Sequence, residues 1–208
     1  MWPGNIIIEN RELENERLEL AGASDQLIAF GPNLTLRRCT VVVRVPGSRL
    51  IVRQPRLIDC TIEFKQEQRN HRGWVSAALK GCRVKGRLIG CDFGPFPGYS
   101  TGGEHGQVED CDFSEARLDG CRFHGCDIRT VRLPRWPCFT IIDPLGNAAA
   151  LNRLNWPGRF GRVIIEGLPK APPSTVAVTW HAPSVTKGLD TTAEELRTIL
   201  EGIDCIIL

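Results

Sequence analysis

The sequence contains no apolar stretch approaching the roughly 18 residues that a membrane-spanning helix needs, although 42% of its 208 residues are hydrophobic. A membrane helix is therefore not expected. The first residues, Met1-Trp-Pro-Gly-Asn-Ile-Ile-Ile-Glu9, have no basic segment before their short apolar run and no recognisable cleavage site. Secretion through a signal peptide is therefore not expected either. Together these absences predict a cytoplasmic protein that does not bind membranes.

The sequence also has little net charge, +2 at pH 7, which is too small to predict binding to nucleic acid through overall charge. The charges are instead segregated along the chain. Residues 65–87 carry seven lysines and arginines against one acid, Glu67, and residues 104–119 carry six acids against one base, Arg117. These segments predict local basic and acidic surfaces, which suit contact with a charged protein partner.

A five-residue repeat dominates the middle of the chain. A small residue stands two places before a large apolar one in Cys111-Asp-Phe113, Ala116-Arg-Leu118, Cys121-Arg-Phe123, Cys126-Asp-Ile128 and Val131-Arg-Leu133. A fixed interval of this kind is typical of a solenoid, in which each repeat stacks on its neighbours. We expect the large residues to fill the interior, the small ones to occupy corners, and the residues between them to point outward.

A longer repeat precedes and overlaps the short one. Some cysteines recur at intervals close to twenty residues. One set is Cys39, Cys60 and Cys82, and the other is Cys91 and Cys111. These intervals match one circuit of a four-sided coil, because four sides of five residues make a coil of twenty. Phe93 is therefore predicted to lie beneath Phe113 and Leu133, one coil and two coils away.

The pattern of Ala or Cys, then Asp or Arg, then Leu or Phe resembles the pentapeptide-repeat family over residues 109–140 and more loosely over residues 6–93. The resemblance implies a right-handed quadrilateral β-helix. We therefore expect a mainly β fold with a β-helix over residues 1–143, irregular at first and pentapeptide-like later. Some relatives of this kind mimic DNA, but that activity needs a long negative surface, which a chain of charge +2 does not offer.

The repeat ends near Pro144, and residues 144–208 predict a small α/β module that caps the solenoid or recognises a partner. We expect a helix over 147–154, a pair of strands over 162–166 and 175–180, and a second helix beginning with the capping-box pattern Thr192-Ala-Glu-Glu195. Within the solenoid, the Gly- and Pro-rich residues 94–103 predict a loop or a distorted coil.

The nine cysteines predict neither a disulfide framework nor a metal centre. Their number is odd, the chain is long enough to bury a core without disulfides, and most of them lie at repeat positions that point inward. The spacing of Cys121, His124 and Cys126 suggests zinc, but the repeat directs these side chains to different sides, whereas zinc needs convergent ligands. Cysteine nucleophiles are disfavoured by the same burial. No cofactor, metal or catalytic residue is predicted.

Two carboxylates offer the strongest enzymatic alternative. The repeat predicts an outward column of Asp92, Asp112 and Arg132, in which the two acids would stand one strand spacing apart. Such a separation is close to the roughly 5 to 5.5 Å between the carboxyl groups of a retaining glycosidase. The sequence offers few loops to wall a substrate groove, so a carbohydrate-active β-helix enzyme remains the alternative.

The leading hypothesis is a non-catalytic, protein-binding solenoid, most plainly a bacterial immunity-type protein that binds and neutralises a toxin. The predicted partner-binding residues are Lys65, Arg69, Arg72 and Trp74 in the basic segment and Asp110, Asp112 and Glu115 in the acidic one. Trp74 could also stack on a nucleic-acid base, but one tryptophan and a few arginines do not make a groove. A structural scaffold that stacks end to end is a third hypothesis.

Overall fold

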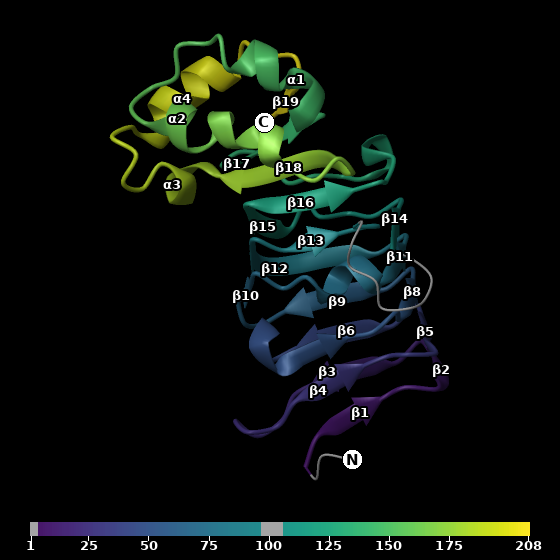
Figure 1. Cartoon of the computed structure of the whole chain (residues 1–208). Helices are drawn as coiled ribbons and strands as arrows, with labels where there is room; N and C mark the ends of the chain where they lie inside the picture. The colour runs from purple at the N-terminus through teal and green to yellow at the C-terminus, as the bar shows by residue number, and fades with distance from the viewer. Residues whose placement is uncertain (1–3, 97–105) are drawn as a thin grey trace.

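Residues 4–96 and 106–208, which the computed structural model describes, form a parallel β-solenoid followed by a region of helices and antiparallel strands (Figure 1). The solenoid winds through about four turns. Its first coil lies at one end of the molecule, and the helices of the C-terminal region lie at the other. The mainly β solenoid that the repeats predict is therefore confirmed.

The first three coils contribute one strand each to three parallel sheets. The first sheet contains β1 (Ile6–Ile8), β4 (Ile28–Phe30) and β7 (Leu50–Val52). The second contains β2 (Arg11–Glu14), β5 (Leu34–Arg37), β8 (Arg56–Ile58), β11 (Ala78–Lys80) and β14 (Gln107–Glu109). The third contains β3 (Arg17–Leu20), β6 (Thr40–Val43), β9 (Thr61–Phe64) and β12 (Arg83–Ile89). The first two coils therefore have three strand-bearing sides, where four were predicted.

The third and later coils add a fourth side, formed by β10 (Gln68–Arg69), the second half of β12 and β15 (Ala116–Asp119). On the side that follows it, β13 (Asp92–Phe93) pairs with β16 (Cys121–His124). Short 3-10 helices occur at Gly47–Arg49, Gly73–Ser76 and Ile128–Thr130. The five-residue repeat therefore places its successive segments on four sides, because each segment is too short to continue along one side.

Phe93 does not lie beneath Phe113, contrary to the prediction from the repeat. Phe93 pairs in register with Phe123. The reason is an enlarged coil: Ala78 pairs with Arg56 of the coil before it and with Gln107 of the coil after it, and the second of these intervals is clearly the longer. The extra residues shift the repeat relative to the coil below. The loop predicted at 94–103 lies mostly outside the described residues.

The cysteines are packing residues, as predicted. All nine are free, and those fully buried are Cys39, Cys60, Cys82, Cys91, Cys111, Cys121 and Cys138. Their thiols also contact carbonyl oxygens of the coil below, with the sulfur of Cys82 3.3 Å from the oxygen of Leu57. A cysteine therefore combines the small volume that the corner requires with a weak hydrogen-bond donor.

The corner before six of these buried cysteines has a left-handed backbone. The residues there have positive φ and are Arg38, Asp59, Gly81, Gly90, Asp110 and Gly120. A Cβ atom on Gly81 would lie 2.3 Å from a carboxylate oxygen of Asp59, the corner residue one coil below. Glycine is needed at this position because the neighbouring side chain fills the space and because φ is +62°.

The C-terminal region has its own core and a shared sheet. Its elements are β17 (Cys138–Ile142), α1 (Pro144–Leu151), α2 (Phe160–Val163), a 3-10 helix (Ile165–Lys170), β18 (Thr175–His181), α3 (Ala182–Val185), α4 (Ala193–Leu200) and β19 (Ile206–Ile207). Strand β18 pairs antiparallel with β16 of the solenoid and with β17. The last coil is therefore covered by an antiparallel strand, which ends the parallel stacking.

The predicted strand over 162–166 is wrong, because α2 and the following 3-10 helix occupy those residues. The strand predicted at 175–180 is confirmed as β18, and its partners come from earlier in the chain. The first predicted helix begins earlier, at Pro144. Strand β17 packs into the C-terminal core with α1, and the division of the chain at residue 143 stays a prediction.

The capping box at the start of α4 is confirmed. Thr192 accepts a hydrogen bond from the N–H of Glu195, and the Glu195 carboxylate accepts one from the N–H of Thr192. We expect Thr192→Ala to lower the free energy of unfolding by about 1 kcal/mol, because it leaves a helix N–H without its partner. Urea denaturation would measure this loss. Thr198→Ala, inside the same helix, is the control and should cost nothing, since alanine favours helices.

Candidate functional site

The predicted basic and acidic segments face each other across adjacent coils. Lys80 Nζ lies 2.8 Å from Glu109 Oε1, and Lys85 Nζ lies 2.9 Å from Glu115 Oε2. Since β11 and β14 are neighbouring strands, side chains that are distant in the sequence become ion pairs. This surface therefore carries both signs of charge, and the prediction of separate basic and acidic strips is wrong there.

Asp112 and Glu115 are engaged in the same network. Asp112 Oδ2 lies 3.7 Å from Arg132 and 3.9 Å from Arg83, and Glu115 contacts Arg83 as well as Lys85. Partial burial of Asp112 opposes ionisation, but the hydrogen bond from Ser114 and the two arginines outweigh it and lower the pKa of its carboxyl. Asp110 is exposed at its corner. A basic partner would meet a largely neutralised strip.

Trp74 is wrongly predicted as a surface residue. Its side chain is fully buried and packs edge to face against Phe64, with ring centroids 5.4 Å apart, and against Phe30. The short 3-10 helix at Gly73–Ser76 turns the ring into the solenoid core. Trp74 therefore contributes to stability and is unavailable for stacking on a base or a partner side chain.

The remaining basic residues of the prediction are exposed. Lys65 and Arg69 form surface ion pairs with Glu63 and Glu67, at 2.7 Å and 2.6 Å. Arg72 is 60% exposed, and its nearest carboxylate is that of Asp92, at 3.8 Å. Exposed pairs of this kind contribute little to stability, so these cations can exchange their present partners for those of another molecule.

Arg69 and Arg72 border a hollow of about 450 Å³ that also contains Ile51 at its edge. A second hollow, of about 430 Å³, begins at Ile51 and extends over Ala29 and Ile7. These three residues are in register at the centres of β7, β4 and β1 and point away from the core. We name the face formed by Ile7, Ala29, Ile51, Arg53, Arg69 and Arg72 the β1–β4–β7 surface.

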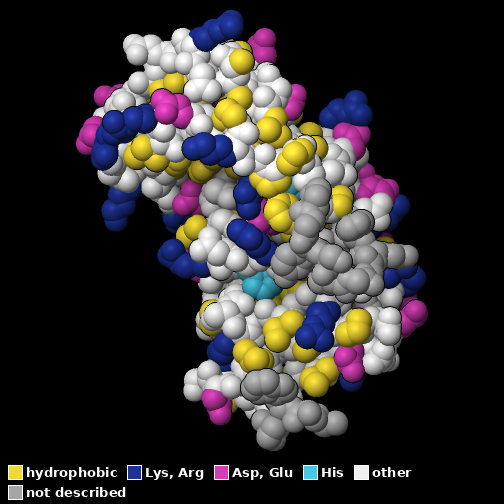
Figure 2. Space-filling model, viewed as in Figure 1, with side chains coloured by type: hydrophobic (Ala, Val, Ile, Leu, Met, Phe, Trp, Pro, Cys, Tyr) yellow, Lys and Arg dark blue, Asp and Glu magenta, His cyan; other side chains and the backbone are white. Residues whose placement is uncertain are grey.

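The β1–β4–β7 surface is more apolar than a solvated sheet face needs to be. Ile7 and Ile51 are 48% and 36% exposed, among the few large hydrophobic side chains that are exposed in the described residues. Figure 2 shows hydrophobic side chains gathered over the N-terminal coils, with basic side chains among them. An apolar strip bordered by cations is a typical feature of a protein-binding site.

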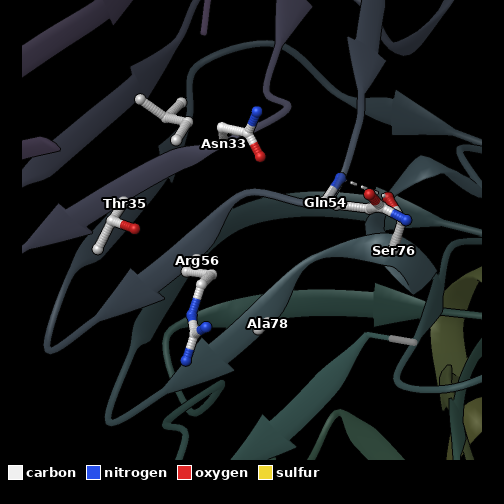
Figure 3. A pocket seen from close by; sticks show the side chains of 7 residues that line it. Asn33, Thr35, Gln54, Arg56, Ser76 and Ala78 are labelled. Atoms are coloured by element: carbon white, nitrogen blue, oxygen red, sulfur yellow. Dashed lines mark hydrogen bonds between the residues drawn. The ribbon is translucent and has the colours of Figure 1, made fainter. Parts of the chain in front are cut away.

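A third hollow, of about 320 Å³, lies over the second sheet between β5, β8 and β11 (Figure 3). Asn33, Thr35 and Arg56 project along it, and the backbone N–H of Gln54 donates to Ser76 Oγ at 3.2 Å. The residues that line it include no carboxylate, histidine or thiol. It therefore lacks the acid and the base that would activate a hydroxyl such as that of Ser76.

A buried polar network joins the solenoid to the C-terminal region. The Asp92 carboxylate is fully buried and accepts two hydrogen bonds from Arg122, at 2.6 and 2.9 Å. His124 Nε2 lies 3.2 Å from the same carboxylate, and His124 Nδ1 lies 3.2 Å from Ser174 Oγ. Burial by itself would raise the pKa of Asp92, but His124 and Arg122 outweigh burial and lower it.

The order Ser174, His124, Asp92 is that of a hydrolase relay, but its surroundings oppose catalysis. A catalytic base must reach the substrate, whereas His124 is fully buried and the ring of Phe96 packs on it with centroids 4.8 Å apart. Both carboxylate oxygens of Asp92 are also held by Arg122. The network therefore fixes the start of β18 against the last coil. The sequence pattern missed it because it placed His124 on the outside.

The stacked pair of acids proposed for a glycosidase is not formed. Asp92 is in register with Arg122, and Asp112 forms bridges with Arg83 and Arg132. The predicted outward column of Asp92, Asp112 and Arg132 is therefore wrong for its first member, which is buried, and right for the other two. The enlarged coil is again the reason, since it displaces Asp92 by two sides of the solenoid, from the side of Asp112 to that of Arg122.

Comparisons with protein-family models, with curated proteins and with solved structures found no match to this chain. No helix in the described part of the chain is long and apolar enough to cross a membrane. The resemblance to pentapeptide-repeat proteins stays a prediction, and function has to be argued from the surfaces described above.

Proposed function

We propose that this chain is a non-catalytic, protein-binding solenoid of the bacterial immunity type, which acts in the cytoplasm by holding a toxin partner on the β1–β4–β7 surface. The carrying observation is the apolar strip of Ile7, Ala29 and Ile51 that ends at the exposed cations Arg69 and Arg72. A rigid parallel sheet beneath the strip keeps these side chains in fixed positions. Little conformational freedom is then lost on binding, which favours affinity.

The chemistry of this surface indicates the chemistry of the partner. Aliphatic side chains of the partner would cover Ile7 and Ile51, and carboxylates would approach Arg53 and Arg72. Exposed arginines at the edge of an apolar strip favour acidic groups and accelerate association with an acidic protein. We therefore propose an acidic toxin surface with protruding aliphatic residues. The enzyme hypothesis has no comparable support, because its two acids are not neighbours.

We also propose that residues 109–140 belong to the pentapeptide-repeat type. In support, the five-residue repeat places Phe113, Leu118 and Phe123 in one buried core from successive sides. The earlier coils differ in length, because their register partners, such as Ile6 and Ile28, stand farther apart in the sequence than Asp112 and Arg132 do. This proposal concerns architecture alone and adds nothing to the choice of partner.

The binding proposal is tested by capture from cells that express the chain, followed by chemical cross-linking and identification of the cross-linked residues. We expect one protein to be cross-linked to the β1–β4–β7 surface. The double variant Ile51→Glu with Arg72→Glu should weaken its binding by about a hundredfold, since an introduced charge lies in the apolar strip and a favourable one is lost. In cells whose growth the captured protein inhibits, co-expression of the wild-type chain should restore growth. Co-expression of the double variant should not.

The matched control is Val163→Glu with Arg162→Glu, which makes the same chemical changes at exposed residues of the C-terminal region. This control should bind as the wild type does. Equal binding by the Ile51 and Arg72 variant would refute the assignment of this surface. Growth unaffected by the captured protein would refute the immunity role while leaving partner binding intact.

A further inference from the structure

The first coil of the solenoid is an open end. Strands β1, β2 and β3 each pair with the coil above, through β4, β5 and β6. On their other edges, no strand pairs with them within residues 4–96 and 106–208. Backbone N–H and C=O groups along three consecutive strands are therefore left for water or for another chain. Such an edge is a template for the addition of a strand.

The core is open at the same end. Ile6, Leu13 and Leu18 are only partly buried. Their register partners one coil above, Ile28, Leu36 and Val41, are all 0% exposed. The inward column of apolar side chains thus extends into the first coil, where no layer of described residues covers it. An added strand would bury these three residues and gain the hydrophobic free energy of their exposed area.

The charge of this coil selects among possible occupants. Between residues 9 and 19 the sequence carries five glutamates and two arginines. Glu14 and Glu19 are paired with Arg38 and Arg44 of the coil above. Glu9, Glu12 and Glu16 form no ion pair with any described residue. The open edge is therefore bordered by acids whose charge is not compensated.

A second copy of this chain is a poor occupant. Joining two first coils head to head would bring the two sets of unpaired glutamates together. Joining the first coil to the opposite end of another copy is obstructed, because β18 already covers β16 there in the antiparallel direction. An occupant that suits both the open backbone and the acids is an extended segment rich in lysine or arginine.

We propose that β1, β2 and β3 bind an extended basic segment of a partner protein as an added strand, its backbone pairing with the open edge and its cations facing Glu12 and Glu16. Main-chain hydrogen bonds provide affinity in this mode, and alternating side chains provide specificity. The open edge adjoins the β1–β4–β7 surface at β1, where Glu9 also lines the hollow over Ile7 and Ala29, but neither proposal requires the other.

A peptide copied from the chain itself is a suitable probe. Residues 34–43 with Cys39→Ser already have the shape of a coil, because the native segment pairs with β2 and β3 on their other edges. The peptide carries Arg37 and Arg38, and native Arg38 already contacts Glu14. Binding of the fluorescently labelled peptide to the full chain would be followed by anisotropy.

We expect saturable binding of this peptide. Replacing both of its arginines by glutamate should weaken binding at least about tenfold through charge. Methylating two backbone nitrogens that face the edge should also weaken it at least about tenfold, because each methyl group removes a hydrogen-bond donor and clashes with the neighbouring strand. Weaker binding of the methylated peptide would distinguish strand addition, which needs backbone hydrogen bonds, from charge attraction alone.

On the protein, Glu12→Lys with Glu16→Lys should weaken binding of the peptide at least about tenfold. The control, Glu166→Lys with Glu194→Lys, changes the net charge equally at exposed sites of the C-terminal region and should bind almost as the wild type does. No detectable binding, unchanged binding of the methylated peptide, or an equal effect of the control would each overturn the proposal. So would a dimer in sedimentation that excludes the peptide.

Discussion

Phe123→Ala is expected to lower the free energy of unfolding by about 3–5 kcal/mol, the usual cost of removing a buried phenylalanine ring. Phe123 is fully buried where the two structural regions meet. Its ring stacks on Phe93 with centroids 5.7 Å apart and meets Phe113 edge to face at 5.1 Å. The cavity would lie between rigid coils that cannot close on it, so the cost should lie toward the upper end.

Urea denaturation, followed by far-ultraviolet circular dichroism, would measure the effect of Phe123→Ala. Val163→Ala is the control because Val163 is 48% exposed and its truncation should change stability by less than about 0.5 kcal/mol. A loss below about 1 kcal/mol for Phe123→Ala would contradict a fully packed junction, since burial of a ring contributes more than that.

Asp92→Asn is expected to cost about 3 kcal/mol, because removing one member of a buried ion pair leaves the other uncompensated. Arg122 would lose its negatively charged partner and one of its two hydrogen bonds, since an asparagine keeps a single acceptor oxygen, and His124 would lose its carboxylate partner. Arg122 is 28% exposed, so water can reach part of its guanidinium, which keeps the expected loss at the lower end of the range for buried pairs. Urea denaturation at pH 7 would measure this loss.

The pH dependence of the same variant identifies the cause. The pKa of Asp92 is lowered in the folded protein, so its ionisation stabilises the fold above the unfolded pKa of about 3.9. This stabilisation is lost as pH falls through the lower, folded pKa. The difference in free energy of unfolding between Asp92→Asn and the wild type should therefore become smaller as pH falls below about 4. Asp127→Asn, at an exposed pair with Arg129, should show a much smaller loss at pH 7. A difference in free energy of unfolding that stays constant with pH would contradict the electrostatic explanation.

The architecture could be predicted because it follows from local repetition. Each Cys-x-Phe or Ala-x-Leu segment requires one inward and one outward direction, and these directions depend only on residues close in sequence. The same holds for the capping box at Thr192, whose two hydrogen bonds join residues of a single helical turn. The strand predicted at 162–166 failed because its apolar residues, including Ile165, pack against α1 as part of a helix, a contact that periodicity does not reveal.

The candidate surface was harder to predict. Trp74 lies in a polar, basic stretch that suggests exposure, yet one turn of 3-10 helix directs the ring into the core. Lys80 and Glu109 appear as members of opposite charged segments, but pairing of neighbouring coils places them in contact. The exposure of Ile7 and Ile51 could not be predicted, because the sequence of a short apolar strand does not distinguish outward from inward isoleucines.

By itself, the sequence determined the solenoid, the inward cysteines and the capped last helix, because each depends on spacing over a few residues. The tertiary structure alone decided which coil lies on which, and the enlargement of the coil between Ala78 and Gln107 changed that register. With the register came the pairing of Asp92 with Arg122 and the neutralised charge strips. These features depend on which residues distant in sequence become neighbours, and spacing along the chain cannot specify that once a coil changes length.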